Sequence, residues 1–206
     1  MFDPDSEIQF SQNVKQLTPE YLQSLSTIEI EATGNFNEVL SQFNTDNKLN
    51  LQPRAEGYHI TIIGPTESKL LSALTPDQLE NLQRINSDIQ HGMGVEVSGI
   101  GFIDGSQREN LRAADKPKKA LYMALNMPAL QEFRQSLGLP RKDFHITLGF
   151  ENGDIHMHVA GKDAKGKDTL QPISKTADPK YQKYTEQLQG LHFGSLSGKE
   201  KDKPKS

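Results

Sequence analysis

The sequence predicts an α+β fold in which one strand and helix unit is used twice. Three observations predict this fold class: strand-like runs alternate with helix-like segments, the order of the elements repeats, and two phrases are nearly identical. The phrases are GYHITIIG at residues 57–64 and DFHITLGF at residues 143–150. Outside them the halves share little residue identity, so the element order and the phrases alone support the duplication.

The first half is predicted to contain three strands and two helices. Its best-defined element is a helix within residues 74–92, where Thr75 can act as N-cap, Pro76 fills the first helical position and Gln78 completes a capping box. Apolar residues then recur every three or four positions, which favours packing on a sheet. These residues are Leu79, Leu82, Ile85 and Ile89. The remaining elements are strands at 26–33, 57–64 and 94–103 and a short helix at 36–43.

Residues 104–119 are predicted to connect the two halves. The segment DGSQRENLRAADKPKK is too polar for a core and carries more cations than acids. Its simpler interpretation is a solvated connector, and the alternative is a flexible basic lip over an anionic ligand.

The second half is predicted to run strand, helix, strand, strand. Its helix, PALQEFRQSLG at 128–138, has one apolar face and ends at Gly138. The strands are expected at 120–127, 143–150 and 154–161.

One domain is expected to cover residues 1–165, followed by a polar C-terminal extension at residues 166–206. The extension is rich in Lys, Asp and Gly, a composition typical of partly disordered segments. Within it, residues 179–189 have the pattern of a capped helix that docks through Tyr181, Tyr184 and Leu188.

Length and composition exclude several classes of protein. A chain of 206 residues is long enough for one domain with its own core. The net charge of -4 argues against broad adhesion to a polyanion, although a local basic patch can still hold a phosphate or a short oligonucleotide. The absence of cysteine excludes disulfides, thiolate metal sites and a cysteine nucleophile.

The start of the chain, MFDPDSEIQF, is acidic where a secretory signal is basic and then apolar. No stretch approaches the length of apolar sequence that spans a bilayer. We therefore expect a cytoplasmic protein that does not contact a membrane, and a monomer with no obligate protein partner.

The two repeated phrases each divide into an apolar and a polar face, because alternate side chains of a strand point to opposite sides. In the first phrase Tyr58, Ile60 and Ile62 share one face and His59 and Thr61 share the other. In the second phrase the apolar face holds Phe144, Ile146 and Leu148, and the polar face holds His145 and Thr147. The polar pairs are therefore expected to face away from the core.

If the two halves face each other across a groove, these four polar side chains converge on a site that suits a phosphodiester. Two histidines of near-neutral pKa can act as base and acid in one displacement. The threonine hydroxyls can donate to the non-bridging phosphoryl oxygens. This chemistry requires no metal ion and no cofactor.

In these phrases the sequence resembles the 2H phosphoesterases, which are defined by two His-x-Thr/Ser-x motifs, here HITI at 59–62 and HITL at 145–148. The motif spacing is similar to that of the bacterial RNA 2′,3′-cyclic phosphodiesterase and RNA-ligase-like members, and the resemblance covers residues 20–161. It implies a bilobal α+β fold, with two antiparallel sheets flanking a central groove and helices packed outside. It also implies metal-independent chemistry on cyclic phosphates or 2′,5′ linkages, with an active tetrad of His59, Thr61, His145 and Thr147.

Four further residues are candidates for substrate contact. Tyr122, on the strand before the second motif, can stack a base, although an aromatic in an apolar strand is more often part of the core. Arg54, Arg141 and Lys142 precede the motif strands and can reach a phosphate from the groove rim, with solvated charges as the alternative.

Two other patterns are weaker. GKDAKGKD at 161–168 has Asp168 where a phosphate-binding loop needs Ser or Thr, so the simpler interpretation is a lysine-rich loop. His156 and His158 share one strand face and are a possible pair of metal ligands, with His145 as a third. No set of carboxylates or cysteines completes such a metal site convincingly. The simpler interpretation is a pair of histidines at the surface or groove rim.

The sequence leaves three hypotheses. The leading one is a metal-independent phosphodiesterase whose substrate is the 2′,3′-cyclic phosphate end of an RNA or a small cyclic or 2′,5′-linked nucleotide. The second is a catalytically inactive module of the same kind that binds RNA ends or nucleotides. The third is a metallohydrolase built around His145, His156 and His158.

Overall fold

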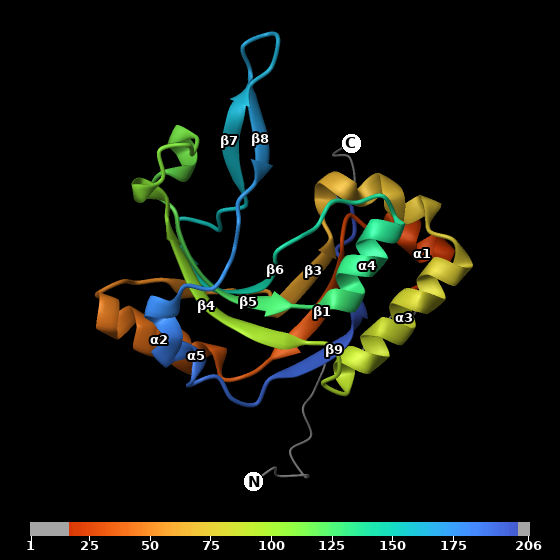
Figure 1. The fold of residues 1–206 in the computed structure, drawn as a ribbon, viewed down its shortest axis with the longest axis horizontal. Coiled ribbons are helices and arrows are strands. Elements are labelled where there is room, and N and C mark those ends of the chain that lie inside the picture. Colours follow the sequence, from red (N-terminus) through yellow and green to blue (C-terminus); the bar gives the residue numbers. More distant parts are fainter. Residues whose placement is uncertain (1–16, 202–206) are drawn as a thin grey trace.

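Two antiparallel sheets and a separate hairpin organise residues 17–201, the part of the chain that the computed structural model describes (Figure 1). The strands of the sheets are β1 (Ile28–Thr33), β2 (Gln52–Pro53), β3 (Tyr58–Ile63), β4 (Glu96–Asp104), β5 (Lys119–Asn126), β6 (Phe144–Glu151) and β9 (His192–Ser197). One sheet has the order β3-β1-β9 and the other has the order β2-β6-β5-β4. The predicted α+β class is confirmed, and the duplication of one unit into two lobes stays a prediction.

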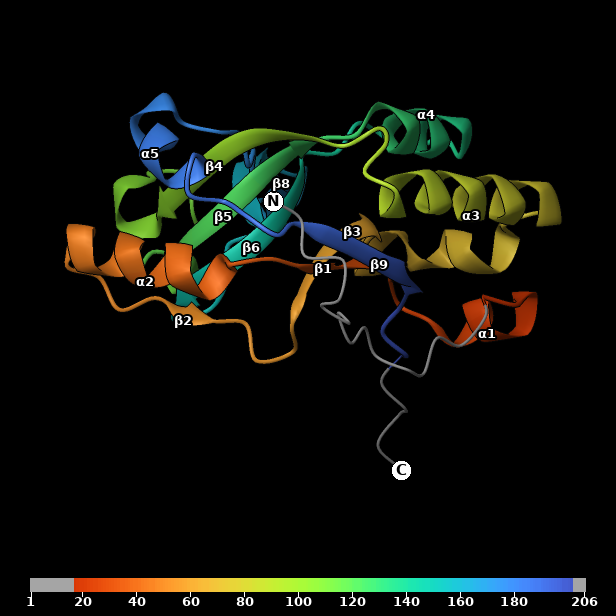
Figure 2. The same ribbon diagram turned by 90° about the horizontal axis from the view of Figure 1, so that it is seen from below.

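Helices cover the sheets at two ends. The α-helices are α1 (Pro19–Ser24), α2 (Phe36–Asn47), α3 (Pro76–Gln90), α4 (Pro128–Ser136) and α5 (Gln182–Thr185). The 3-10 helices are η1 (Pro65–Ala73), η2 (Gly105–Gln107), η3 (Ala113–Asp115) and η4 (Pro179–Tyr181). Figure 2 shows α2 and α5 at one end of the sheets and α1, α3 and α4 at the other.

The start of α3 has the predicted capping box. Thr75 Oγ1 accepts a hydrogen bond from the backbone N–H of Gln78 at 3.2 Å, and Gln78 Oε1 accepts one from the backbone N–H of Thr75 at 2.9 Å. The apolar stripe of α3, including Leu82 and Ile85, is buried, and the helix packs against β9 and α4. The sequence pattern therefore gives both the first residue of this helix and the face that it buries.

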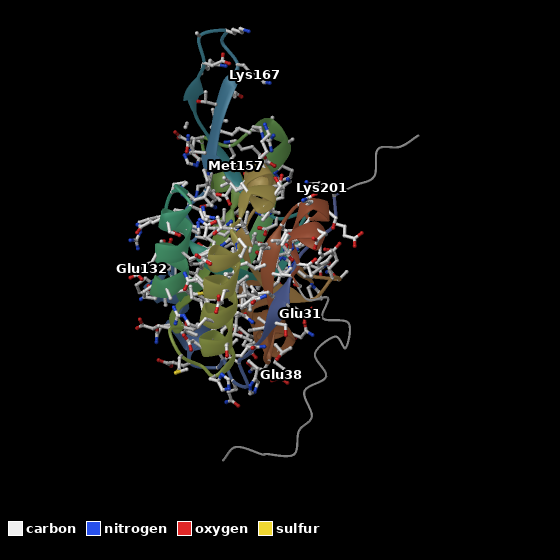
Figure 3. All side chains as sticks on the ribbon, turned by 90° about the vertical axis from the view of Figure 1, so that its right-hand side faces the viewer. Glu31, Glu38, Glu132, Met157, Lys167 and Lys201 are labelled. Atoms are coloured by element: carbon white, nitrogen blue, oxygen red, sulfur yellow. The ribbon has the colours of Figure 1, made fainter. Side chains whose placement is uncertain are left out.

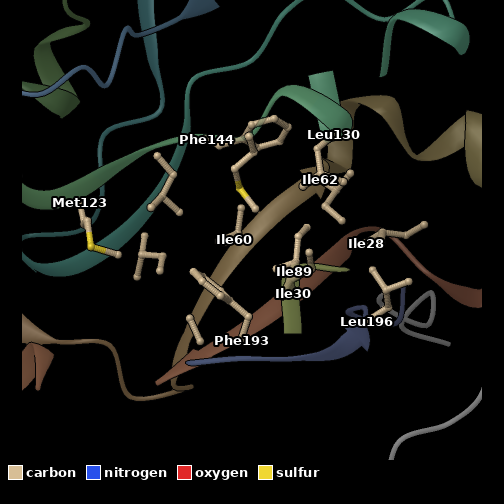
Figure 4. Close-up of a cluster of buried hydrophobic side chains, with 14 of the residues drawn as sticks. Ile28, Ile30, Ile60, Ile62, Ile89, Met123, Leu130, Phe144, Phe193 and Leu196 are labelled. Carbon is tan, nitrogen blue, oxygen red and sulfur yellow. The ribbon is translucent and has the colours of Figure 1, made fainter. Parts of the chain in front are cut away.

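One hydrophobic core joins the two sheets. Figure 4 shows side chains of β1, β3, β6 and β9 gathered in a single cluster. Ile60 and Ile62 of β3 and Phe144 of β6 are fully buried there, whereas His59 and His145 are half-buried. The apolar faces of both phrases are buried as predicted. On the polar faces His59, Thr61 and His145 are partly exposed, whereas Thr147 is buried.

The strands that carry the two motifs lie side by side. β3 and β6 are in contact although they belong to different sheets (Figure 1). Residues 59 and 145, far apart in the sequence, are therefore carried on neighbouring strands.

The C-terminal segment differs from the polar, partly disordered extension expected from residue 166. Residues up to Lys201 are described, and β9 pairs with β1, with Leu196 opposite Ile30 and Phe193 opposite Ala32. The expected extension did not include this strand, whose side chains Phe193 and Leu196 are buried. Residues 202–206 lie outside the described part of the chain.

The helix expected at 179–189 is shorter than predicted, because η4 is followed by only one turn of α-helix in α5. Its docking is as predicted. Tyr184 is buried, and the rings of Tyr181 and Tyr184 pack against Phe43 of α2 with centroid distances of 5.4 Å and 5.0 Å.

A hairpin of β7 (Met157–Lys162) and β8 (Asp168–Pro172) projects from the body of the molecule (Figure 1). Figure 3 shows Met157 at its base and Lys167 near its tip. Its turn is the exposed segment 163–167, so GKDAKGKD is a lysine-rich hairpin rather than a phosphate-binding loop. The backbone N–H of Val159 donates to the Asn110 carbonyl at 2.7 Å, which ties the hairpin to the connector.

The helices within residues 17–201 are all too short or too polar to cross a membrane.

Candidate active site

The first motif lies on β3 opposite two glutamates of β1. The antiparallel register places Glu31 opposite His59 and Glu29 opposite Thr61. His59 Nε2 lies 3.6 Å from Glu29 Oε2, and both side chains are largely buried. Burial, with the nearby cations Arg54 and Lys199, lowers the pKa of His59 to about 4, and burial raises the pKa of Glu29. His59 is therefore a neutral imidazole at pH 7 in the unliganded protein.

The ring of the second histidine is held in one tautomer by the backbone. His145 Nδ1 lies 2.8 Å from the carbonyl oxygen of Asp143. A carbonyl can only accept, so Nδ1 carries the hydrogen and Nε2 has a free lone pair in the neutral ring. Burial and the charge of Lys175 hold the pKa of His145 well below its ordinary value, which keeps the ring neutral.

The second threonine contacts a buried ion pair. Thr147 Oγ1 donates to Asp154 Oδ2 at 2.7 Å, and Lys175 Nζ donates to Asp154 Oδ1 at 2.8 Å. The side chains of Lys175 and Asp154 are only 2% and 5% exposed. Burial raises the pKa of Asp154, but Lys175, His156 and the hydrogen bonds together outweigh it, so the pKa lies well below the usual range. Asp154 is thus an ionised carboxylate directly beside the second motif.

The segment that carries Lys175 packs tightly on the second sheet. A Cβ at Gly101 of β4 would come within 2.5 Å of the Thr176 carbonyl oxygen and within 2.6 Å of the Tyr122 ring. Glycine at position 101 therefore allows residues 173–177 to lie on the sheet, where Lys175 Nζ is 5.6 Å from the centroid of the Tyr122 ring.

The charge of one carboxylate, Asp154, affects the pKa of both histidines. Burial lowers the pKa of His59 and of His145, and the negative charge of Asp154 opposes that effect at both rings. The two motifs themselves are brought together by the contact between β3 and β6.

Tyr122 lies beside the second motif but is buried. Its ring centroid is 6.1 Å from that of His145, and its hydroxyl donates to the Thr176 carbonyl at 3.0 Å. Only 4% of Tyr122 is exposed, which favours the interpretation that it belongs to the core.

The three basic candidates are placed differently. Arg54 is half-buried, and its charge lowers the pKa of His59 and also of His156 and Lys175. Lys142 is also half-buried, and a Cβ on Gly64, at the end of β3, would be 3.6 Å from its Nζ. Burial lowers the pKa of Lys142 to about 8. Arg141 is exposed.

Three residues next to the motifs were missed by the sequence interpretation: Glu29, Asp154 and Lys175. Glu29 had a usable signal, because STIEIEAT alternates acids with isoleucines and so places acids on the polar face of its strand. Asp154 alternates with His156 and His158 in DIHMH, which was a weaker signal of the same kind. Lys175 had none, since its partner Asp154 lies 21 residues earlier in the sequence.

The histidines of the metal hypothesis do not form a ligand cluster. Between residues 17 and 201, no three His, Cys, Asp or Glu side chains are placed to hold one metal ion. His156 Nε2 lies 3.8 Å from Asp154 Oδ2, and His158 Nδ1 is buried with no hydrogen-bond partner. The metal hypothesis therefore has the sequence pattern as its sole support.

Comparison with known families gives one match. The family model described as "Swiss Army Knife, 2H phosphoesterase domain" matches residues 24–156. The match contains both His-x-Thr motifs and Asp154 and ends before Lys175. No curated protein and no solved structure matches the chain significantly.

Proposed function

The chain belongs to the 2H phosphoesterase family, and from this premise we propose that it is a metal-independent cyclic phosphodiesterase. Its substrate would be the 2′,3′-cyclic phosphate end of an RNA or a small cyclic or 2′,5′-linked nucleotide. The family itself supports a phosphoesterase-type activity. The observation that carries the finer proposal is that His59 and His145 lie on the contacting strands β3 and β6.

The two histidines have different partners, which suggests different roles. His145 has its Nδ1 hydrogen engaged by the Asp143 carbonyl, so its Nε2 is an acceptor suited to a general base. His59 Nε2 faces the Glu29 carboxyl group. That group and the phosphate of a bound substrate both favour a protonated ring, which suits a general acid.

Thr61 is proposed to donate a hydrogen bond to a non-bridging phosphoryl oxygen. It is half-buried on the same face of β3 as His59. Two cations, Arg54 and Lys142, lie near this strand and would attract the phosphate. One hydroxyl donor and two basic groups would thus stabilise the negative charge that develops on the phosphoryl oxygens in the transition state.

Replacing Thr61 with Val is expected to lower kcat/KM on the order of 10²-fold, because a donor to the developing charge is lost while the branched shape is kept. Steady-state kinetics on a 2′,3′-cyclic nucleotide measures the effect. The matched control is Thr169→Val on the exposed strand β8, which should retain the wild-type rate. Equal rates for both variants would remove Thr61 from the site.

The pH dependence of kcat/KM is expected to be bell-shaped and to lie on the acidic side of an ordinary imidazole. The active form needs one neutral and one protonated ring, and kcat/KM reports the free enzyme. The pKa of His59 is about 4 and the pKa of His145 is lowered as well. As the pH rises, the acid is therefore half deprotonated at a pH below about 6.5, the ordinary pKa of an imidazole. A falling limb well above pH 7 would contradict this assignment.

The same assay in EDTA separates the hypotheses. Two side chains need no ion, so the curve should be unchanged by the chelator. Loss of activity that added zinc or manganese restores would instead favour the metallohydrolase around His145, His156 and His158. Tight retention of a nucleotide without turnover would identify a catalytically inactive binding module.

Substrate class is tested by comparing turnover of 2′,3′-cyclic nucleotides, RNA with a cyclic phosphate end and 2′,5′-oligoadenylate. We propose a monomer as the working unit, because both motifs come from one chain. We also propose the cytoplasm as its location, which agrees with the absence of cysteine.

A further inference from the structure

The chain returns to the second motif after the hairpin of β7 and β8. Residues 173–177, which we call the returning segment, leave β8 and cross the second sheet toward α5 (Figure 1). Ile173 and Lys175 are buried, and the Thr176 carbonyl accepts the hydroxyl hydrogen of Tyr122 at 3.0 Å. The family match ends at residue 156, so it assigns no role to this segment.

One contact of the returning segment holds the residue that orients His145. Ser174 Oγ donates to Asp143 Oδ2 at 2.8 Å, and the backbone N–H of Lys175 donates to the same oxygen at 3.2 Å. The carbonyl oxygen of Asp143 in turn accepts the Nδ1 hydrogen of His145 at 2.8 Å. Asp143 therefore links the position of the returning segment to the orientation of the His145 ring.

A second contact of the returning segment holds the residue that orients Thr147. Lys175 Nζ donates to Asp154 Oδ1 at 2.8 Å, and Thr147 Oγ1 donates to Asp154 Oδ2 at 2.7 Å. The backbone N–H of Ile155 also donates to Oδ1, at 2.7 Å. Because the Lys175 and Asp154 side chains are only 2% and 5% exposed, each needs the other as its charged partner. The pair therefore fixes the Asp154 carboxylate, and with it the direction of the Thr147 hydroxyl group.

We propose that Lys175 is a positioning residue of the active site, which together with Ser174 holds His145 and Thr147 in place from one segment. The inference rests on the proposed function. Lys175 acts through Asp143 and Asp154, each of which contacts a motif residue directly. Catalytic groups work best when such neighbouring residues fix their geometry before the substrate binds. The returning segment is thus part of the active site although the family match ends before it.

Lys175→Met is expected to lower kcat on a 2′,3′-cyclic nucleotide by about 10- to 10²-fold and to leave KM nearly unchanged, because small displacements of catalytic groups slow the chemical step. Lys175→Arg keeps the charge and a donor to Asp154 and should recover part of the loss. The matched control is Lys167→Met, which changes an exposed lysine near the tip of the hairpin and should keep the wild-type rate (Figure 3).

Asp143→Ala tests the link to His145 while leaving the buried pair intact. It removes the carboxylate that binds Ser174 and the backbone N–H of Lys175, but it keeps the backbone carbonyl. Since Asp143 is exposed, this variant should fold even if Lys175→Met does not. We expect a fall in kcat of about 10-fold, again with little change in KM.

The tautomer of the His145 ring measures positioning without any substrate. Nitrogen NMR of the unliganded wild type should show the ring hydrogen on Nδ1, as the bond to the Asp143 carbonyl requires. Lys175→Met and Asp143→Ala should each lower the share of this tautomer, and Lys167→Met should not. A side chain that only stabilises the fold would leave the tautomer of the folded protein unchanged.

The outcomes separate this inference from the proposed function. A wild-type kcat or an unchanged tautomer in folded Lys175→Met would each overturn the positioning role and leave the phosphodiesterase proposal intact. If Lys175→Met does not fold, Asp143→Ala decides by the same two measurements. No turnover of any phosphodiester by the wild type would instead overturn the proposed function, and this inference with it.

Discussion

Replacing either His59 or His145 with Ala is expected to lower kcat/KM by about 10² to 10⁴-fold, because each replacement leaves one of two proton transfers uncatalysed. The expected losses are similar although the two rings have different partners, Glu29 for His59 and the Asp143 carbonyl for His145. Turnover of a 2′,3′-cyclic nucleotide, followed near the optimum of the pH profile, measures the effect.

The two histidine variants should remain folded. Both rings keep partial exposure on the polar faces of their strands, and the core is formed by the opposite faces. His91→Ala is the matched control, because His91 is exposed at the end of α3 and should be replaceable without loss of rate. A folded His59 or His145 variant with a near-wild-type rate would refute the two-histidine mechanism.

Replacing Arg134 with Met is expected to lower the free energy of unfolding by about 3–5 kcal/mol, the range measured when one partner of a buried ion pair is removed. Arg134 is 2% exposed. Its guanidinium binds both carboxylate oxygens of Glu67, at 2.9 Å and 2.7 Å, and the Ile62 carbonyl at 2.6 Å. It also donates to the Pro140 carbonyl. One side chain thus ties the end of the first motif strand to the loop before the second.

Urea unfolding of three variants tests this expectation. Arg84→Met breaks an exposed pair with Asp88 on α3 and should cost less than about 1 kcal/mol. The double change Arg134→Met and Glu67→Gln should recover part of the loss, since it removes the carboxylate left without a partner. A cost for Arg134→Met as small as that of Arg84→Met would contradict the structural role.

Strand and helix periodicity predicted much of the fold from local signals. Alternation in the two phrases separates His59 and His145 from the apolar residues that fill the core, and the capping box at Thr75 fixes the start of α3. Arg134 had a weaker signal of the same kind. It lies four residues after Leu130 and therefore on the apolar face of α4, where a charged group needs a partner.

What could not be predicted depends on contacts between distant segments. Lys175 reaches Asp154 only because residues 173–177 return over the second sheet, and no local pattern marks that return. The expectation of near-neutral histidines failed for a similar reason. Alternation places His59 on a polar face, but the burial that lowers its pKa arises from surrounding segments.

The pairing of β9 with β1 has a consequence for how the protein is made. During synthesis β1, β3 and α3 all leave the ribosome before β9, so one edge of β1 has no strand partner until residues 192–197 emerge. Lys175 also follows both motifs in the chain. Pairing across such a separation is slow compared with local contacts. The sheet that contains the first motif therefore stays incomplete until almost all of the described residues have been synthesised. Until then Ile30 and Ala32 of β1 are not paired with Leu196 and Phe193 of β9.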